Sequence, residues 1–158
     1  MEKLKRVTGL WRGIYSFDAS ERLPQRAPVS FTLNLKQGWF GRFKGSVTDD
    51  PASGMPGTGV IFGRLSFPRI AFIKQMPVCC VAVPGGSMIT LREYLIGNGY
   101  HCEKDPPHSP ILYEGEFSSP SLAQGTWVIR AGQRSLPDGR ALKTLETKGS
   151  WSMEACAG

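Results

Sequence analysis

The stretch from Gly9 to Phe17 alternates between two kinds of residue with a period of two. One parity is glycine and aromatic, namely Gly9, Trp11, Gly13, Tyr15 and Phe17, while the residues between them are mixed. A period of two is that of a β-strand whose faces meet different surroundings. A glycine two positions before an aromatic residue returns later, at Gly41-x-Phe43, Gly115-x-Phe117, Gly125-x-Trp127 and Gly149-x-Trp151. The chain therefore repeats one type of strand, with its glycine and aromatic face directed at a common interior.

The same alternation predicts eight strands in all. They cover residues 9–17, 28–36, 39–49, 57–66, 69–76, 110–117, 123–129 and 145–153, and most connections between them have hairpin length. Eight sequential antiparallel strands with one apolar face each are best hidden by closure, which also removes unpaired edges. We therefore expect a single all-β domain, an eight-stranded antiparallel up-and-down β-barrel. A two-sheet sandwich is the alternative, although its crossings need longer connections than most of those seen here.

The region 77–109 interrupts this rhythm. Residues 78–83 are apolar without alternation and predict a buried extension or an extra strand, and Pro84 to Gly86 end it. Ser87 is a candidate N-cap for one short helix through about Ile96. This long connection is a candidate lid over one end of the barrel. Further on, Leu136-Pro-Asp-Gly139 predicts a turn.

A Gly-x-Trp pair that opens the first strand of a small meander barrel resembles the calycins, which comprise lipocalins, fatty-acid-binding proteins and avidins. It is also similar to lipocalin-like domains of uncharacterised bacterial proteins. The resemblance implies that Trp11 packs across a closed barrel end, against a basic residue such as Arg130 or Lys148. It does not extend to biotin binding, because Arg12 and Ile14 stand where an avidin has small polar groups. The two-helix lid of a fatty-acid-binding protein and the signal and disulfides of a secreted lipocalin are not evident in the sequence.

The resemblance and the inward parity together predict non-enzymatic binding of a small, mostly apolar molecule inside the barrel. The expected apolar contacts are Phe31, Leu33, Phe43, Ile61, Phe72 and Trp127, with Lys74, Tyr15 and Tyr113 orienting one polar end. A buried lysine is costly unless it is paired, so Lys74 either meets a ligand, reaches solvent at the rim, or pairs with Asp49 or Asp50. The four tryptophans are expected in the core or as end plugs. The inward glycines either leave a cavity or only tighten the coil of the strands.

Catalytic and metal-binding patterns are weak. His101, Cys102, Asp105 and His108 fall within one loop, but their spacing is irregular, and Cys79, Cys80, Cys102 and Cys156 match no zinc pattern. The sequence has no convincing nucleophile elbow. We expect no enzyme activity, no metal, no cofactor, and reduced thiols.

The formal net charge is +6. Arg12, Arg42, Lys44 and Arg64 project outward beside Phe62, but no recognised nucleic-acid motif accompanies them, so solvated charge is the better interpretation. The alternative function is a scaffold barrel with a filled interior that binds a protein or nucleic acid through this basic outer face. No apolar run approaches a membrane span, and a cytoplasmic location is expected.

Overall fold

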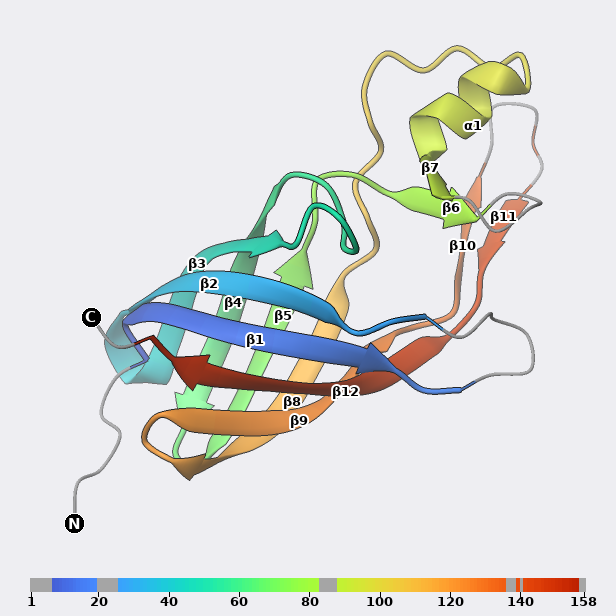
Figure 1. Ribbon diagram of the computed structural model, residues 1–158. Coiled ribbons are helices and arrows are strands. Elements are labelled where there is room, and N and C mark those ends of the chain that lie inside the picture. The colour runs from blue at the N-terminus through green and yellow to red at the C-terminus, as the bar shows by residue number, and fades with distance from the viewer. Residues whose placement is uncertain (1–6, 20–25, 83–87, 136–138, 140, 157–158) are drawn as a thin grey trace.

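The computed structural model describes residues 7–19, 26–82, 88–135, 139 and 141–156. Eight antiparallel strands close into one barrel, which confirms the predicted fold (Figure 1). These strands are β1 Gly9–Phe17, β2 Val29–Gln37, β3 Arg42–Asp49, β4 Thr58–Ser66, β5 Arg69–Gln75, β8 Ile111–Ser119, β9 Leu122–Ile129 and β12 Thr147–Ala155. Around the barrel their order is β1, β12, β9, β8, β5, β4, β3, β2. Each strand thus pairs with its neighbours in the chain, and β1 closes the barrel against β12, so the sandwich is excluded.

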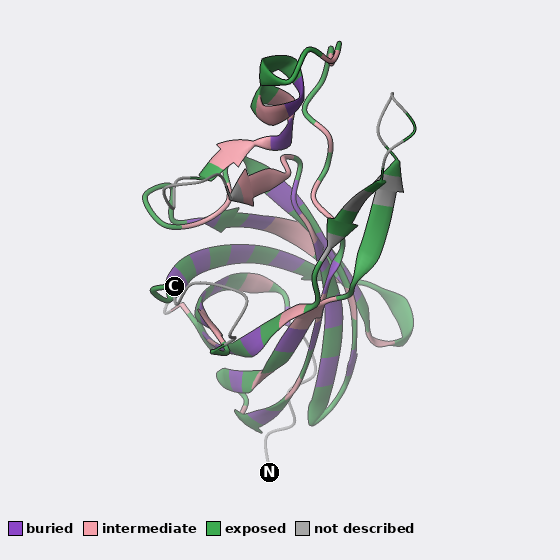
Figure 2. Cartoon of the chain, turned by 90° about the vertical axis from the view of Figure 1, so that its right-hand side faces the viewer, coloured by how far each residue is buried: buried purple, intermediate pink, exposed green. Residues whose placement is uncertain are grey.

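The alternation of residue types in the sequence matches the alternation of buried and exposed side chains in the structure. In β2, Val29, Phe31, Leu33 and Leu35 are buried, and the residues between them are exposed. Figure 2 shows the same striping along the other barrel strands. Because successive side chains of a strand point to opposite faces, one parity fills the interior and the other covers the outside.

The two ends of the barrel differ in the length of their connections. At one end, which we call the short-turn end, the strands are joined by residues 38–41, 67–68 and 120–121. At the other, the open end, they are joined by residues 18–28, 50–57, 76–110 and 130–146. All the long connections therefore gather around one mouth of the barrel.

Two of these long connections carry elements of their own beyond the open end (Figure 1). They are β6 Cys80–Ala82, β7 Met88–Thr90 and α1 Leu91–Gly97 in one, and β10 Gly132–Ser135 and β11 Ala141–Thr144 in the other. β6 is the extra strand expected within 78–83, whereas the hairpin of β10 and β11 was not predicted. The expected strand stop at Pro84 to Gly86 and most of the turn at 136–139 lie outside the described residues.

The predicted start of the helix is wrong. Residues 88–90 form a strand, and the helix begins at Leu91, capped by Thr90, whose hydroxyl accepts a hydrogen bond from the Glu93 N–H at 3.0 Å. Ser87, the expected N-cap, lies outside the described residues. Thr90 and Glu93 form the serine/threonine-x-x-glutamate spacing of a capping box, which is a stronger start signal than a lone serine.

Aromatic rings fill the middle of the barrel. The Phe72 ring stacks on the Tyr113 ring with centroids 4.7 Å apart, and meets the Trp151 ring edge-on at 5.5 Å. Gly115 and Gly125 face each other on β8 and β9, and a Cβ on Gly115 would meet both the main chain of β9 and the Trp151 ring. The inward glycines at this level therefore make room for rings and close strand contact rather than leaving a void.

Two tryptophans show opposite outcomes at the short-turn end. Trp11 is buried, donates from Nε1 to the Val7 carbonyl at 2.8 Å and packs edge-on against Phe117. Trp39, expected in the core, is 85 % exposed in a 3-10 turn, η1 Trp39–Gly41, so β3 begins at Arg42 rather than at residue 39.

The expected basic partners of Trp11 are also wrong, because β1 and β12 are antiparallel. Trp11 lies opposite Ala155, while Lys148 and Arg130 lie toward the open end.

Candidate functional site

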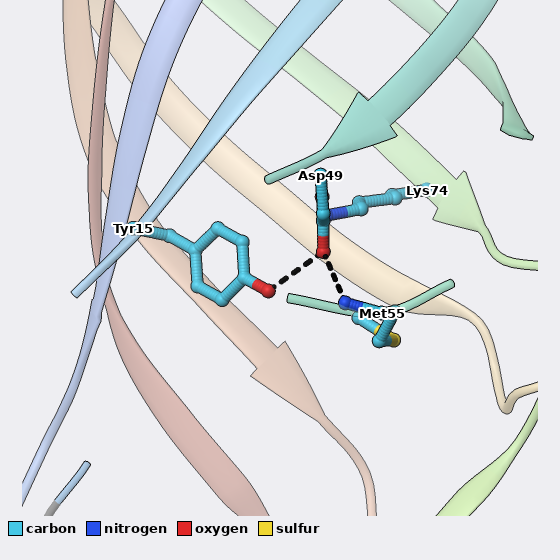
Figure 3. A network of polar contacts seen from close by, with 4 residues as sticks. All are labelled: Tyr15, Asp49, Met55 and Lys74. Carbon is cyan, nitrogen blue, oxygen red and sulfur yellow. Dashed lines mark hydrogen bonds and ion pairs between the residues drawn. The ribbon is translucent and has the colours of Figure 1, made fainter. Parts of the chain in front are cut away.

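A buried carboxylate organises the open end of the barrel. Asp49 is the last residue of β3 and is 2 % exposed. Its Oδ2 accepts hydrogen bonds from the Tyr15 hydroxyl at 2.8 Å and from the Met55 N–H at 3.1 Å, and its Oδ1 meets the Lys74 ammonium at 2.6 Å (Figure 3). The three donors come from β1, from the connection 50–57 and from β5, so one side chain joins three parts of the mouth.

Lys74 lies inside the barrel, on the predicted parity, and is 1 % exposed. Its Nζ lies 4.6 Å from the centroid of the Tyr15 ring and 5.5 Å from that of Phe31, which is within cation–π range. Burial lowers the pKa of Lys74, and the Asp49 charge opposes that shift. Of the alternatives the sequence left open, the structure shows pairing with Asp49.

A cavity of about 230 Å³ lies at the open end. Its inner wall comes from the ends of three barrel strands, through Tyr15 on β1, Ile111 and Tyr113 on β8, and Trp127 and Ile129 on β9. Its outer wall comes from the long connections, through Arg26, residues 52–55, Cys80, Met88 and His108. The connection predicted to act as a lid thus contributes three residues to this wall.

The cavity has an aromatic wall with fixed rings. The Trp127 ring meets Tyr15 and Phe17 edge-on, at 6.0 and 5.2 Å between centroids. Its indole Nε1 donates to the Ser16 carbonyl at 3.0 Å, which ties the ring to β1. At the mouth, the Arg26 guanidinium lies 4.4 Å above the Phe17 ring. The inner wall of the cavity therefore presents preformed aromatic surfaces, whereas the flexible side chains of Arg26 and Met88 lie in the outer wall.

Tyr113 is a buried polar group of this wall for which the described residues supply no hydrogen-bond partner. It is 2 % exposed, and no residue that the structure describes hydrogen-bonds to its hydroxyl. Burial and the nearby Asp49 charge raise the pKa of Tyr113, and the same two causes raise that of Tyr15. Both hydroxyls therefore keep their protons. That of Tyr15 is used by Asp49, and that of Tyr113 is available to a ligand.

The residues predicted to bind a ligand divide into two groups. Tyr15, Tyr113 and Trp127 line the cavity. The others are buried but do not line it: Phe31, Leu33, Phe43, Ile61, Phe72 and Lys74. Leu33 and Phe43 lie farther along the barrel toward the short-turn end, in the ring-filled core, and Lys74 is held by Asp49.

Asp49 was named from the sequence only as a possible partner of Lys74, and it shares the inward parity of Phe43 and Val47. Ile129 and Met55 were not assigned to the site. Ile129 lines the cavity because β9 ends there. Met55 contributes through its main-chain N–H, which leaves no sequence signal.

The structure separates the two histidines of the loop cluster. His101 is exposed and lies 3.4 Å from Glu103, whereas His108 reaches the cavity wall. Within the described parts of the chain, no three His, Cys, Asp or Glu side chains are grouped as a metal ion would require. Burial raises the pKa of the Cys80 thiol, with nearby Cys79 as the next cause, which disfavours the thiolate form.

Comparison of the chain with protein-family models, with curated proteins and with solved structures gives no match. Across the described segments, no helix is long and apolar enough to cross a membrane.

Proposed function

We propose that this protein binds a compact, mostly apolar molecule in the open-end cavity, without catalysing a reaction on it. The observation that carries the proposal is the buried, unpartnered hydroxyl of Tyr113 in a wall built from Tyr15, Trp127 and Ile129. A polar group buried without a partner costs free energy, which a ligand that supplies the partner recovers. The resemblance of the barrel to calycins agrees with this proposal.

The volume limits the class of ligand. Sites for drug-sized molecules span roughly 300–1,000 Å³, and the cavity has about 230 Å³. We therefore infer a ligand the size of one or two fused rings, with one oxygen or nitrogen placed to meet Tyr113. Haem, flavins and retinoids are too large for the space as the described residues enclose it.

Thermal unfolding in the presence of phenol, indole, 1-naphthol and benzaldehyde tests this proposal. A compound that occupies the cavity at about 100 times its Kd should raise Tm by roughly 5 to 10 °C. Haem, flavins, retinoids and long fatty acids are too large for the cavity, serve as controls and should leave Tm unchanged. The proposal is overturned if none of the compact compounds raises Tm.

Two variants tie such a shift to the cavity. Ile129→Trp should remove it by filling the space, and Tyr113→Phe should weaken binding by about tenfold, as expected for loss of one hydrogen bond. Tyr94→Phe makes the same chemical change on α1, outside the cavity wall, and should leave the shift unchanged. A shift that survives both cavity variants would place the binding elsewhere on the molecule.

A further inference from the structure

Two pairs of positive charges face each other on the outside of the barrel. Lys36 on β2 lies directly opposite Lys44 on β3, and Arg42 on β3 lies directly opposite Arg64 on β4. All four side chains are exposed. Like charges directly opposite in an antiparallel pair destabilise the sheet. The free protein therefore carries a local electrostatic cost at this place.

In the described part of the chain, these four cations are not paired with acidic side chains. Arg12, which the sequence grouped with Arg42, Lys44 and Arg64, is separated from them, since it lies opposite Glu154 on β12 and Thr32 on β2. A cluster of unpaired cations of this kind is complementary to an anion with several charges.

An apolar row continues from the cations across the sheet. The register places Lys44, Phe62, Ile73 and Leu112 side by side on β3, β4, β5 and β8. Phe62 is 54 % exposed. These residues and the four cations line a groove of about 800 Å³ on the outer face, whose one acidic residue is Glu114. The groove thus joins a charged half to an apolar half that contains an aromatic ring.

The turn at one end of the groove presents two more aromatic rings. Trp39 and Phe40 are 85 % and 88 % exposed, between the groove residues Gly38 and Arg42. Phe40 has a φ of 55°, a left-handed conformation that is rare and costly for a bulky side chain. Exposed aromatic rings in a strained turn beside unpaired cations are typical of a binding surface rather than of a surface selected for stability.

We propose that this outer groove binds single-stranded nucleic acid. Phosphates would lie against Lys36, Lys44, Arg42 and Arg64, and bases would stack on Phe62 and on the rings of the turn. A positively charged groove with aromatic stacking platforms is the usual arrangement for single strands bound without sequence preference. This surface is separate from the open-end cavity and does not depend on its function.

The shape of the surface favours this occupant over two others. A bilayer is flat, whereas these residues line a groove. An acidic peptide matches only the charged half of the groove, and it cannot add a strand to this sheet because every barrel strand is already paired on both sides. A flexible chain of phosphates and bases can follow both the charged half and the apolar half.

Fluorescence anisotropy with a labelled oligothymidylate of about 16 nucleotides provides the test. For single-stranded nucleic acid, the slope of log K against log salt is about −0.7 for each phosphate neutralised. Four cations therefore predict a slope near −2.8. Between about 50 and 200 mM salt the affinity should fall roughly 50-fold.

Phe40→Gly should relieve the strained turn, raise Tm, and weaken binding by about fivefold or more through the lost stacking.

A charge-reversal variant separates binding from folding. Lys44→Glu with Arg64→Glu converts both facing pairs into opposite charges, so it should raise Tm while abolishing binding. Lys104→Glu with Lys143→Glu changes the net charge equally at exposed positions outside the groove, and should keep most of the affinity. Absence of oligonucleotide binding at low salt, or equal loss in both double variants, would refute the proposal. So would tighter, groove-dependent binding of phosphatidylserine vesicles or of polyglutamate.

Discussion

The two ends of this barrel are built from the same alternating strands but are stabilised in different ways. At the short-turn end, Trp11 and Phe117 pack ring against ring and the indole N–H of Trp11 donates to the nearby Val7 carbonyl. At the open end, the interior holds a lysine, an aspartate and two tyrosine hydroxyls. One end is closed by apolar packing, and the other carries buried polar groups beside a cavity.

The groups whose burial costs free energy therefore lie at the open end. Burying an ion pair rarely gains stability over apolar residues of the same volume, so the pair of Asp49 and Lys74 is not explained by folding alone. It fixes the mouth instead, because Asp49 also holds Tyr15 and the main chain at Met55. The contrast can be tested by substitutions at the open end and in the ring-filled interior.

The largest effect should come from breaking the buried pair. Asp49→Ala or Lys74→Ala alone should lower the free energy of unfolding by about 3–5 kcal/mol, because each leaves a buried charge without its partner. Urea unfolding followed by far-UV circular dichroism measures this loss.

The control is replacement of both residues by apolar ones of similar size. Asp49→Leu combined with Lys74→Met should recover most of the stability lost in the single variants. If the double variant is as unstable as the sum of the singles, the pair is a net source of stability and the contrast between the two ends fails.

The ring-filled interior should be sensitive to added volume. A Cβ on Gly125 would meet the main chain of Glu114 and Gly115, which cannot move aside within the sheet. Gly125→Ala should therefore destabilise the protein by about 1–3 kcal/mol in the same unfolding assay. Gly132→Ala, whose Cβ meets nothing within 4 Å, should be near neutral, and equal effects at the two positions would mean that the interior is loosely packed.

The smallest effect at neutral pH should come from Tyr113→Phe, within about 0.5 kcal/mol of the parent, since the hydroxyl it removes has no protein partner. The difference should appear in alkali. The pKa of Tyr113 is raised in the folded protein, so above the ordinary value of 10.0 the unfolded chain loses this proton first. That proton therefore stabilises the fold fully below pH 10, and the contribution is lost as the pH rises.

Unfolding of the two proteins at about pH 8 and about pH 11 measures this loss. The parent should lose roughly 1.4 kcal/mol per pH unit above pH 10 that the Phe variant does not lose. The pKa of Lys74 is lowered in the folded protein, so Lys74 makes stability rise with pH below its ordinary value of 10.5. Lys74 is present in both proteins, so its contribution cancels in the comparison. Parallel pH profiles would show that the Tyr113 hydroxyl reaches solvent.

The barrel could be predicted because its signal is local and repeated. Each strand shows the period of two, and closure follows from eight apolar faces in sequential order. The hairpin of β10 and β11 was missed because its strands have only four residues each, which is too short for a clear alternation. Trp39 was misplaced because a tryptophan beside a strand usually belongs to the core, and nothing in the local pattern indicates that the turn directs it outward.

The contents of the interior were less accessible to sequence reasoning. The parity of Lys74 and Asp49 predicts that both point inward, but which residues lie against a cavity depends on how the long connections fold over the mouth. The four-cation surface depends on register between strands, which no single strand reveals. Lys36 was left out of the predicted basic stripe for that reason.

Closure of β1 against β12 also has a consequence for the order of folding. Trp11 pairs with the Ala155 position, so nearly the whole chain lies between the two strands that seal the barrel. Contacts between such distant residues are slow to form because a long loop must first be ordered. During synthesis, β1 and β9 keep a free edge until the last strand leaves the ribosome, and in that interval they are exposed to pairing with other chains.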